Sequence, residues 1–212
     1  MILVNEFLFF PYNGNTIEAL DCLGSEDIFI GFIDDDKKKQ GIERYGYNIF
    51  DRDIINKYPK SKILAAPGNS DNFITRQGII NSLNLPQKRF ARIIHPKSSV
   101  SKLAEIGFNV LIMSGVVITS NVRIGNHICI LPNSVVHHDS VIENYCLIGA
   151  GVNIAGNTVI HENCYIGSGS NIINGIEIGE KSLVGLGTNV IKIYPKYSKI
   201  IGNPSRIIGK TL

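Results

Sequence analysis

The chain has 212 residues, of which 44% are hydrophobic and 18% are charged, and its formal net charge is +3. This composition excludes a disordered chain, which is rich in charge, and a heptad coiled coil, which is rich in Leu, Glu and Lys. The small net charge gives no reason to expect a nucleic-acid partner, and we predict none. The 36 isoleucines and 21 glycines predict a β-rich protein with branched side chains packed inside.

The cysteines and the N-terminal segment bear on the cellular compartment. The four cysteines form no CxxC pair, which favours reduced thiols in a cytoplasmic protein. The first ten residues, MILVNEFLFF, lack a basic leader and a small-residue cleavage site, so we expect no signal peptide. No apolar run approaches the ~18–20 residues of a transmembrane helix, so we expect no membrane span, while peripheral contact with a membrane stays open.

Residues 1–99 alternate strand and helix patterns, which predicts an N-terminal α/β domain with a small Rossmann-like parallel sheet. Ligands of such sheets bind at the carboxyl ends of the strands, here residues 11–15, 34–36 and 67–69. In chain order we expect a strand at 2–10, a turn at 13–15, a helix at 16–23, a strand at 28–33, a helix N-capped by Asp51 and ending at Tyr58, a strand at 62–66, a loop at 67–69, a helix at 70–83 and a short strand at 93–94.

Residues 100–191 repeat with a period of six. A branched aliphatic residue recurs at every sixth position without an insertion, and a small or β-branched residue usually stands two positions earlier. This period fits neither an amphipathic helix nor a long strand, but it fits a solenoid of short strands joined by regular corners. The repeated positions are Ile106, Ile112, Ile118, Ile124, Ile130, Val136, Ile142, Ile148, Ile154, Ile160, Ile166, Ile172, Ile178, Val184 and Val190.

The period resembles the hexapeptide repeat of the left-handed parallel β-helix, in which three strands make one coil. Residues 100–191 then form about five coils of eighteen residues, and the handedness follows from the resemblance alone. The tail, 192–212, has five Lys or Arg and no acidic residue, and its Pro204 predicts that it ends the coil and turns back or outward.

Stacking at eighteen residues aligns three G-x-G segments, at 149–151, 167–169 and 185–187. They predict a strip almost free of side chains, where a long thin ligand has access to backbone N–H and C=O groups. The alternative interpretation is structural, because tight corners need glycine for positive φ.

The pair His137-His138 is followed by Asp139, and Gly156 stands one coil above His138. Neighbours in a strand point to opposite faces, so the two imidazoles have different surroundings. A carboxylate beside His138 would fix one tautomer of the imidazole, and a bare position above it leaves room for a reacting group. A surface histidine without a catalytic role is the alternative.

With these motifs the chain resembles the sugar acetyltransferases of bacterial nucleotide-sugar pathways, of the bacillosamine-type N-acetyltransferase and sialic-acid O-acetyltransferase type. The resemblance covers nearly the whole chain. It implies a cytoplasmic homotrimer with active sites between neighbouring prisms, which transfers an acetyl group from acetyl-CoA to a nucleotide-linked amino sugar and needs no metal. The motifs that carry it are GFIDDD at 31–36, APGN at 66–69, IHP at 94–96, the hexapeptide coils, VVHHD at 135–139 and GNPSR at 202–206.

The resemblance also implies roles for single residues. His138 takes the position of the general base and Asp139 that of its partner carboxylate. The first loop, 11–15, departs from the family's G-A-x-G-H pattern, and Leu147 stands where the family has a further histidine. The implied contacts of the nucleotide sugar are Asn13, Gly14, Asn15, Asp34, Asp35 and Asn133. Those of coenzyme A are Gly156, Ser168, Gly185, Leu186, Gly187, Lys192 and Arg206.

Three alternatives stay open. The first is transfer to a sugar hydroxyl, as in the sialic-acid type. The second is a zinc hydratase on the same prism, as in γ-type carbonic anhydrases, although the histidines at 127, 137, 138 and 161 are not separated by multiples of eighteen. The third is a scaffold that binds partners along a flat prism face, which predicts that acetyl-CoA does not bind.

Overall fold

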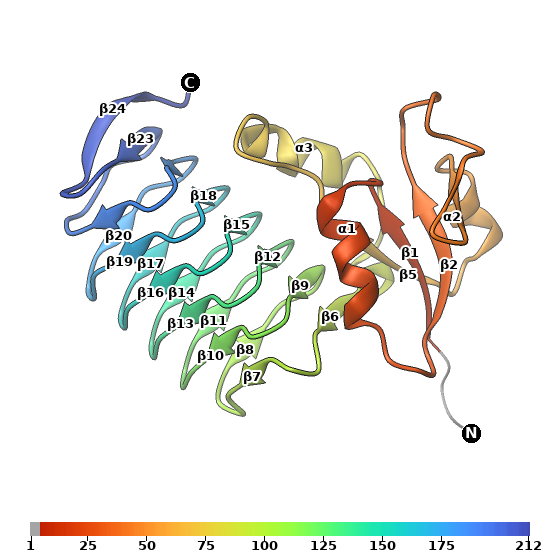
Figure 1. The fold of residues 1–212 in the computed structure, drawn as a ribbon, viewed down its shortest axis with the longest axis horizontal. Helices are drawn as coiled ribbons and strands as arrows, with labels where there is room; N and C mark the ends of the chain where they lie inside the picture. The colour runs from red at the N-terminus through yellow and green to blue at the C-terminus, as the bar shows by residue number, and fades with distance from the viewer. Residues whose placement is uncertain (1–4) are drawn as a thin grey trace.

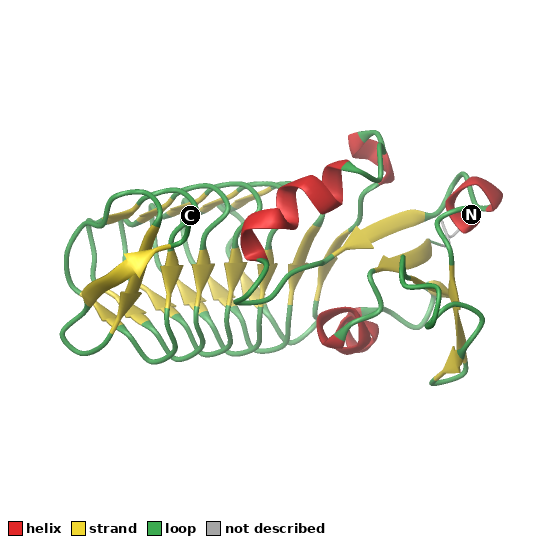
Figure 2. Ribbon diagram, turned by 90° about the horizontal axis from the view of Figure 1, so that it is seen from above, coloured by secondary structure: helices red, strands yellow, loops and turns green. Residues whose placement is uncertain are grey.

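The computed structural model describes residues 5–212, so part of the strand predicted at 2–10 lies outside the described residues. Figure 1 shows an α/β domain beside a prism of stacked short strands, with the C-terminus at the far end of the prism. Seen from above, in Figure 2, one helical segment extends from the α/β domain along the side of the prism.

The N-terminal domain contains a five-stranded sheet of order β3-β4-β2-β1-β5. The central strand, β1 (Glu6–Phe10), pairs in parallel with β2 (Ile28–Ile33) and with β5 (Lys62–Ala65). β2 also pairs in parallel with β4 (Tyr47–Phe50), and β3 (Glu43–Arg44) adds an antiparallel edge. The predicted parallel sheet is therefore confirmed, and the hairpin β3–β4 is an addition that the apolar pattern did not indicate.

The helices of this domain are shorter than the sequence predicts. Asp51 is not an N-cap, because its carboxylate accepts the N–H of Asp53 at 3.0 Å and the helix begins only at Ile54. The segment predicted as one helix at 70–83 starts late, because the side chain of Asn69 accepts the N–H groups of Asp71 and Asn72 and holds a turn. The helical segments are α1 (Gly14–Glu18), η1 (Ala19–Cys22), α2 (Ile54–Lys57), η2 (Phe73–Thr75), α3 (Arg76–Asn81) and η3 (Gln87–Arg89).

The prism has three sheet faces, and from β6 (Arg92–Ile94) to β22 (Asn189–Val190) each strand pairs in parallel with the strand eighteen residues away. Face 1 consists of β6 (Arg92–Ile94), β9 (Val110–Ile112), β12 (Cys129–Ile130), β15 (Leu147–Ile148), β18 (Tyr165–Ile166), β21 (Leu183–Val184), β23 (Ser198–Ile201) and β24 (Arg206–Lys210). Face 2 consists of β7 (Ser99–Val100), β10 (Val117–Ile118), β13 (Val135–Val136), β16 (Asn153–Ile154), β19 (Asn171–Ile172) and β22 (Asn189–Val190). Face 3 consists of β8 (Glu105–Ile106), β11 (Arg123–Ile124), β14 (Val141–Ile142), β17 (Val159–Ile160) and β20 (Glu177–Ile178).

The six-residue repeat fills the interior of the prism, as predicted. Every repeated position from Ile112 to Val190 is at most 3% exposed, and Ile106 is partly buried at the open end. The small residues two positions earlier are buried as well, and their hydroxyls are satisfied between coils. Ser134 Oγ, for example, donates to the carbonyl of Gly149 at 2.7 Å and accepts the N–H of Val152 at 3.1 Å. The buried hydroxyls at these positions therefore tie successive coils together.

Three corners join the faces, and residues with positive φ recur along each of them. Corner A, between faces 1 and 2, contains Gly115, Asn133, Gly151, Gly169 and Gly187. Corner B, between faces 2 and 3, contains Asn121, Asp139, Asn157 and Gly175. Corner C, between faces 3 and 1, contains Asn109, His127, Tyr145, Asn163 and Lys181.

The prism extends beyond the repeat at both ends. β6 pairs with β9, so face 1 begins at Arg92. At the other end β23 pairs in parallel with β21, so the coil continues to Ile201. β24 then turns back antiparallel to β23 across the segment that contains Pro204, which confirms the predicted reversal of the tail.

A buried polar cluster joins α3 to corner C. Arg76 is 0% exposed, and burial lowers its pKa to about 10. Its guanidinium donates to the carbonyl of Pro67 and, at 2.9 Å, to the carbonyl of His127. The His127 ring stacks on Tyr145 with 4.7 Å between ring centroids, and its Nδ1 lies 3.0 Å from the side-chain amide of Asn109. The same amide binds the backbone of Ala65, so the cluster links the sheet to the prism.

His127 predicts a pH-dependent stability. Burial, and secondarily the charge of Arg76, lowers its pKa to about 4 from the ordinary 6.5. The unfolded chain takes up a proton below pH 6.5 while the folded His127 stays neutral, so the free energy of unfolding falls between pH 6.5 and 4, by up to about 3 kcal/mol. We expect His127→Asn, which suits the φ of 61°, to flatten this slope in denaturant titrations.

His161 provides a control of opposite sign. Although burial opposes it, the hydrogen bonds that His161 donates to Glu177 and Glu143 raise its pKa. This group therefore stabilises the fold at low pH and loses that contribution as pH rises through its folded pKa. His161→Gln is therefore expected to steepen the loss of stability on the acid side. If the free energy of unfolding of His127→Asn depends on pH as steeply as that of the wild type, His127 is not the source of the acid-side loss of stability.

Candidate functional site

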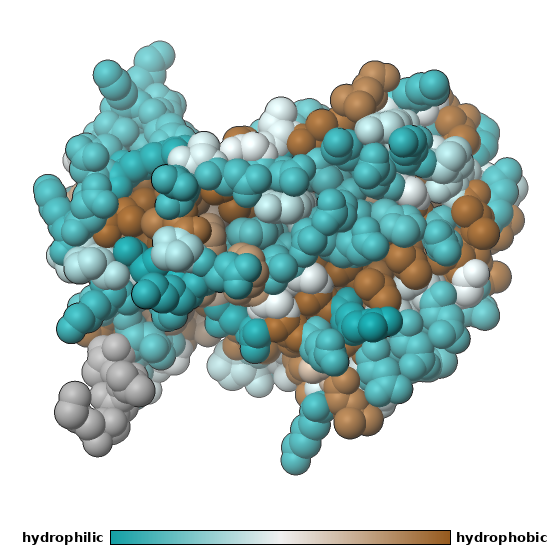
Figure 3. All heavy atoms as spheres, turned by 180° about the vertical axis from the view of Figure 1, so that it is seen from behind, coloured by the Kyte–Doolittle hydropathy of each residue, from teal (hydrophilic) through white to brown (hydrophobic). Residues whose placement is uncertain are grey.

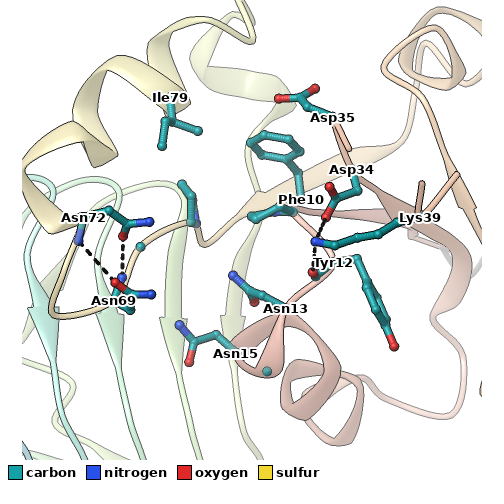
Figure 4. A pocket seen from close by; sticks show the side chains of 14 residues that line it. Phe10, Tyr12, Asn13, Asn15, Asp34, Asp35, Lys39, Asn69, Asn72 and Ile79 are labelled. Atoms are coloured by element: carbon teal, nitrogen blue, oxygen red, sulfur yellow. Dashed lines mark hydrogen bonds and ion pairs between the residues drawn. The ribbon is translucent and has the colours of Figure 1, made fainter. Parts of the chain in front are cut away.

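The carboxyl ends of β1, β2 and β5 meet around one cavity of about 490 Å³. The three segments singled out from the sequence, 11–15, 34–36 and 67–69, all contribute to its wall, and Figure 4 shows their side chains around it. The lining residues are Phe10, Pro11, Tyr12, Asn13, Gly14, Asn15, Asp34, Asp35, Lys39, Pro67, Gly68, Asn69, Asn72 and Ile79.

The two acidic residues of the cavity differ in their partners. Asp34 is nearly buried, and its carboxylate accepts from Lys39 Nζ at 2.9 Å and from the N–H of Asp36 at 2.9 Å. Asp35 pairs in bidentate fashion with Arg52, at 2.6 and 2.7 Å. In Figure 4 Lys39 reaches toward Asp34 and the backbone of Tyr12, on the side of the cavity opposite Asn69. One lysine therefore presents positive charge to this cavity.

Asn13 shapes the first wall of the cavity. Its side chain accepts the N–H of Thr16 at 3.0 Å, and Thr16 Oγ1 accepts the N–H of Asn13 at 3.1 Å, which forms a capping box on α1. The amide of Asn13 also donates to the carbonyl of Ala66 at 3.1 Å, which joins this loop to the loop after β5. Asn13 is thus a structural residue of the wall as well as a lining residue.

A second, smaller cavity of about 120 Å³ continues the first toward the prism. Both cavities share Asn15, Gly68 and Asn69. The further walls come from face 1 and its corner: Leu131, Leu147, Ile148, Gly149 and Tyr165. Sequence reasoning missed Lys39 and Asn72 of the N-terminal domain, and Leu131 and Tyr165 of face 1. Leu131 and Tyr165 point outward from face 1, and that position identifies them only once the domain is known to pack on that face.

His138 and Asp139 lie at corner B, away from both cavities. His138 Nδ1 lies 2.7 Å from Asp139 Oδ2, and Asn121 donates to Asp139 Oδ1 at 3.1 Å. The hydrogen bonds from His138 and Asn121 lower the pKa of Asp139, which stays ionised. An ionised carboxylate only accepts, so Nδ1 carries the proton and Nε2 keeps a free lone pair. The pair is chemically a base held in one tautomer.

Gly156 lies against the imidazole, as the eighteen-residue register predicts. A Cβ added to Gly156 would approach Cε1 and Nε2 of His138 within 2.7 and 2.8 Å, closer than real Cβ contacts. The His138 side chain is 58% exposed, so the ring is open to whatever approaches from outside the coil.

The aligned glycines occupy corner A and have a structural reason. A Cβ on Gly149 would lie 2.5 Å from the N of Ser168, and one on Gly167 would lie 2.7 Å from the N of Leu186, because the next coil passes directly over them. Ser168 Oγ accepts the N–H of Ala150 at 3.0 Å, and Leu186 is 73% exposed.

The remaining predicted residues fall at different corners. Asn133 lies at corner A and does not line the N-terminal cavity. Among the predicted coenzyme A contacts, Gly156 and Lys192 follow strands of face 2, at corner B, whereas Ser168 and Gly185–Gly187 follow strands of face 1, at corner A. Arg206 is the exposed first residue of β24. One chain therefore does not bring the whole predicted set together.

Two negative observations apply to residues 5–212. Within that range, no group of three or more His, Cys, Asp or Glu side chains is placed to hold a metal ion. None of the helices in the same range has the length and apolar character needed to cross a bilayer.

The fold is that of a hexapeptide-repeat protein: a left-handed parallel β-helix preceded by a small α/β domain. Residues 104–138 match the family model of the bacterial transferase hexapeptide (six repeats). No curated protein matches the sequence.

Three solved structures share this architecture over nearly the whole chain. A mutant of perosamine N-acetyltransferase from Caulobacter crescentus, in complex with CoA and GDP-perosamine, has a TM-score of 0.83 at 24% identity, covering 98% of each chain. The acetyltransferase domain of PglB from Neisseria gonorrhoeae FA1090, in complex with acetyl coenzyme A, has a TM-score of 0.83 at 22% identity, covering 97% of this chain and 100% of its own. WeeI from Acinetobacter baumannii AYE has a TM-score of 0.81 at 23% identity, with the same coverage. At these identities the likeness establishes the fold.

Proposed function

We propose that this protein is an acetyl-CoA-dependent acetyltransferase that acylates the amino group of a nucleotide-linked sugar, with His138 as the general base. The observation that carries the proposal is the His138–Asp139 pair, oriented with a free Nε2 beneath the bare Gly156 of the next coil. The shared fold supports it, because structures of this architecture hold CoA with GDP-perosamine, or acetyl coenzyme A.

The proposed step is direct transfer. The neutral amine attacks the thioester carbonyl, and its proton passes to Nε2 of His138. The C–N bond forms as the C–S bond breaks. Coenzyme A leaves as the thiolate, which takes up the proton from Nε2 and becomes the free thiol. General-base assistance of this kind contributes about 10²–10⁴-fold in rate. Asp139 stabilises the imidazolium and keeps the ring in place, because its carboxylate stays ionised.

The N-terminal cavity supports a nucleotide sugar as the acceptor. It lies at the carboxyl ends of three parallel strands, where ligands of such sheets bind. It offers the Lys39 ammonium beside Asp34 and the amide groups of Asn13, Asn15 and Asn69, which are suitable partners for phosphate, ribose and base. The smaller cavity beyond Asn69 leads from this site toward face 1.

The reaction needs more than one copy of the chain. His138 lies at corner B, while the N-terminal domain packs on face 1, so base and cavity of one chain do not meet. A coenzyme A that touches the predicted residues of corners A and B lies between two prisms. Face 2 suits such packing, because its outward residues include no Asp, Glu, Lys or Arg. They include Ile173 and Ile191, and they form an amide ladder from Asn153 through Asn171 to Asn189 at 2.9 Å per step. We propose a homotrimer, and light scattering that finds a monomer would contradict it.

A substrate panel tests the proposed activity. UDP-, GDP- and dTDP-linked amino sugars are mixed with acetyl-CoA, and release of the free thiol is followed together with the mass of the sugar product. We expect acetylation of at least one amino sugar and none of the matched hydroxy sugars. Binding of acetyl-CoA without transfer to any acceptor would favour a scaffold, and transfer only to hydroxy sugars would favour O-acetylation.

Gly156→Ala is expected to lower kcat by roughly ten- to a hundredfold, since the new methyl displaces the imidazole of His138. The ring is exposed and rotates away at a cost of about 1 kcal/mol, so the melting temperature should change little. Gly78→Ala, on α3, is the matched control, because its added Cβ meets no atom within 4 Å. Wild-type turnover in Gly156→Ala would mean that His138 does not act at this position.

A further inference from the structure

The C-terminal end of the prism, residues 192–212, combines positive charge with exposed branched side chains. It carries five Lys or Arg residues and no Asp or Glu. All five cations are exposed, and so are four large apolar side chains of the same segment. The cations are Lys192, Lys196, Lys199, Arg206 and Lys210, and the apolar side chains are Ile193, Ile207, Ile208 and Leu212.

These side chains surround the end of the prism. Lys192 and Ile193 follow β22 at corner B, and Lys196 precedes the positive-φ residue Tyr197, which is paired with the coil below at corner C. Arg206 begins β24, the outermost strand of face 1. In Figure 3, where this end of the prism is on the right, brown apolar surface lies among teal hydrophilic side chains.

Aromatic character adds to this surface. The ammonium groups of Lys181 and Lys196 lie 5.7 and 5.6 Å from the ring centroid of Tyr197. The Tyr197 hydroxyl donates to Glu180 at 3.1 Å, so one acidic side chain of the preceding coil is already engaged. A tyrosine with flanking lysines is common where a protein meets the interface of a bilayer.

We propose that this end of the prism docks on the surface of a membrane that contains anionic phospholipid. Each lysine or arginine side chain near such a surface raises the affinity for the anionic headgroups by roughly fivefold. Exposed isoleucines add burial at the boundary between headgroups and acyl chains. Lys196, Lys199 and Lys210 are outside the residues proposed for coenzyme A, so this surface does not depend on the proposed activity.

Other occupants fit the surface less well. Two copies joined end to end would bring two sets of five cations together without an acidic partner, which like-charge repulsion opposes. A nucleic acid would use the cations but would leave the isoleucines at phosphates and sugars. Only an anionic lipid surface uses the charge and the apolar side chains together.

Co-sedimentation of the full chain with vesicles tests the proposal. We expect binding to vesicles of phosphatidylcholine mixed with phosphatidylglycerol, no binding to phosphatidylcholine alone, and weakening as salt is raised. Lys196→Glu/Lys210→Glu is expected to lower the partition coefficient by roughly thirtyfold or more. Ile207→Ser/Ile208→Ser should weaken binding at a fixed charge.

Lys37→Glu/Lys38→Glu is the matched control. It changes the net charge by the same amount on two exposed lysines of the N-terminal domain, and it should leave vesicle binding unchanged. Equal loss in this control, unchanged binding in both end-face variants, or no binding to either vesicle would overturn the proposal. The proposal would also be overturned if the protein binds no vesicles but self-associates with rising concentration, and if Ile207→Ser/Ile208→Ser abolishes that self-association. Melting temperatures near that of the wild type show that the variants fold.

Discussion

Replacing His138 with alanine should reduce kcat by about 10²–10⁴-fold while leaving the affinity for acetyl-CoA unchanged. The imidazole is more than half exposed, and its hydrogen bond goes to the neighbouring Asp139, so its removal takes little from the core. The loss therefore falls on the proton transfer. Stopped assays of thiol release, combined with calorimetric titration of acetyl-CoA, separate turnover from binding.

His95→Asn is the matched control for this variant. His95 lies at the turn before face 2, and its Nδ1 accepts the N–H of Lys97 at 3.0 Å, a hydrogen bond that an asparagine side chain reproduces. We expect it to keep wild-type turnover. Full activity in His138→Ala would remove His138 from the mechanism, and loss of acetyl-CoA binding in that variant would make it a binding residue instead.

The prism could be predicted from the sequence because its period is a property of neighbouring residues. One aliphatic side chain per six residues is required wherever a short strand faces the axis of the prism. The positions from Ile112 to Val190 therefore predict the coil, its register and its corners. The same register places Gly156 over His138, and the structure has this contact. The local repeat thus predicts one part of the candidate site, the contact between His138 and Gly156.

The cavity could be predicted only in outline. The strand order brings 11–15, 34–36 and 67–69 together, and that rule needs no side-chain detail. Lys39 reaches Asp34 only because residues 34–40 fold back through hydrogen bonds from Asp36 and Gln40 to Asp34. Such a turn has no period, so it leaves no signal in a single sequence.

The relation of the two halves could not be predicted. Leu111 and Leu147 read as ordinary outward positions of face 1, yet they form one core with Phe7 and Phe73 of the N-terminal domain. This packing directs the cavity to face 1 and leaves His138 on the opposite corner. The resemblance implies a homotrimer. The geometry adds a reason for it, because the proposed reaction requires the cavity and His138 to come from different copies of the chain.

Arg76 is the residue on which this packing should depend most. Its guanidinium is fully buried and donates to the carbonyls of Pro67 and His127, and among residues 5–212 no carboxylate pairs with it. Arg76→Ala removes these donors and leaves a cavity, so we expect the free energy of unfolding to fall by about 3–5 kcal/mol in denaturant titrations. Because Pro67 lines the N-terminal cavity, the KM for the nucleotide sugar should rise more than kcat falls.

Two further substitutions at this position separate charge from hydrogen bonding. Arg76→Lys keeps a cation that reaches one carbonyl and should recover part of the stability. Arg76→Met fills the volume without charge or donors. Replacing a buried charge with an apolar side chain is often neutral, so a methionine variant as stable as the wild type would show that the hydrogen bonds to Pro67 and His127 contribute nothing net. We expect it to fall between alanine and lysine, since both carbonyls stay buried without a donor and the loop at 67–69 loses its anchor to corner C.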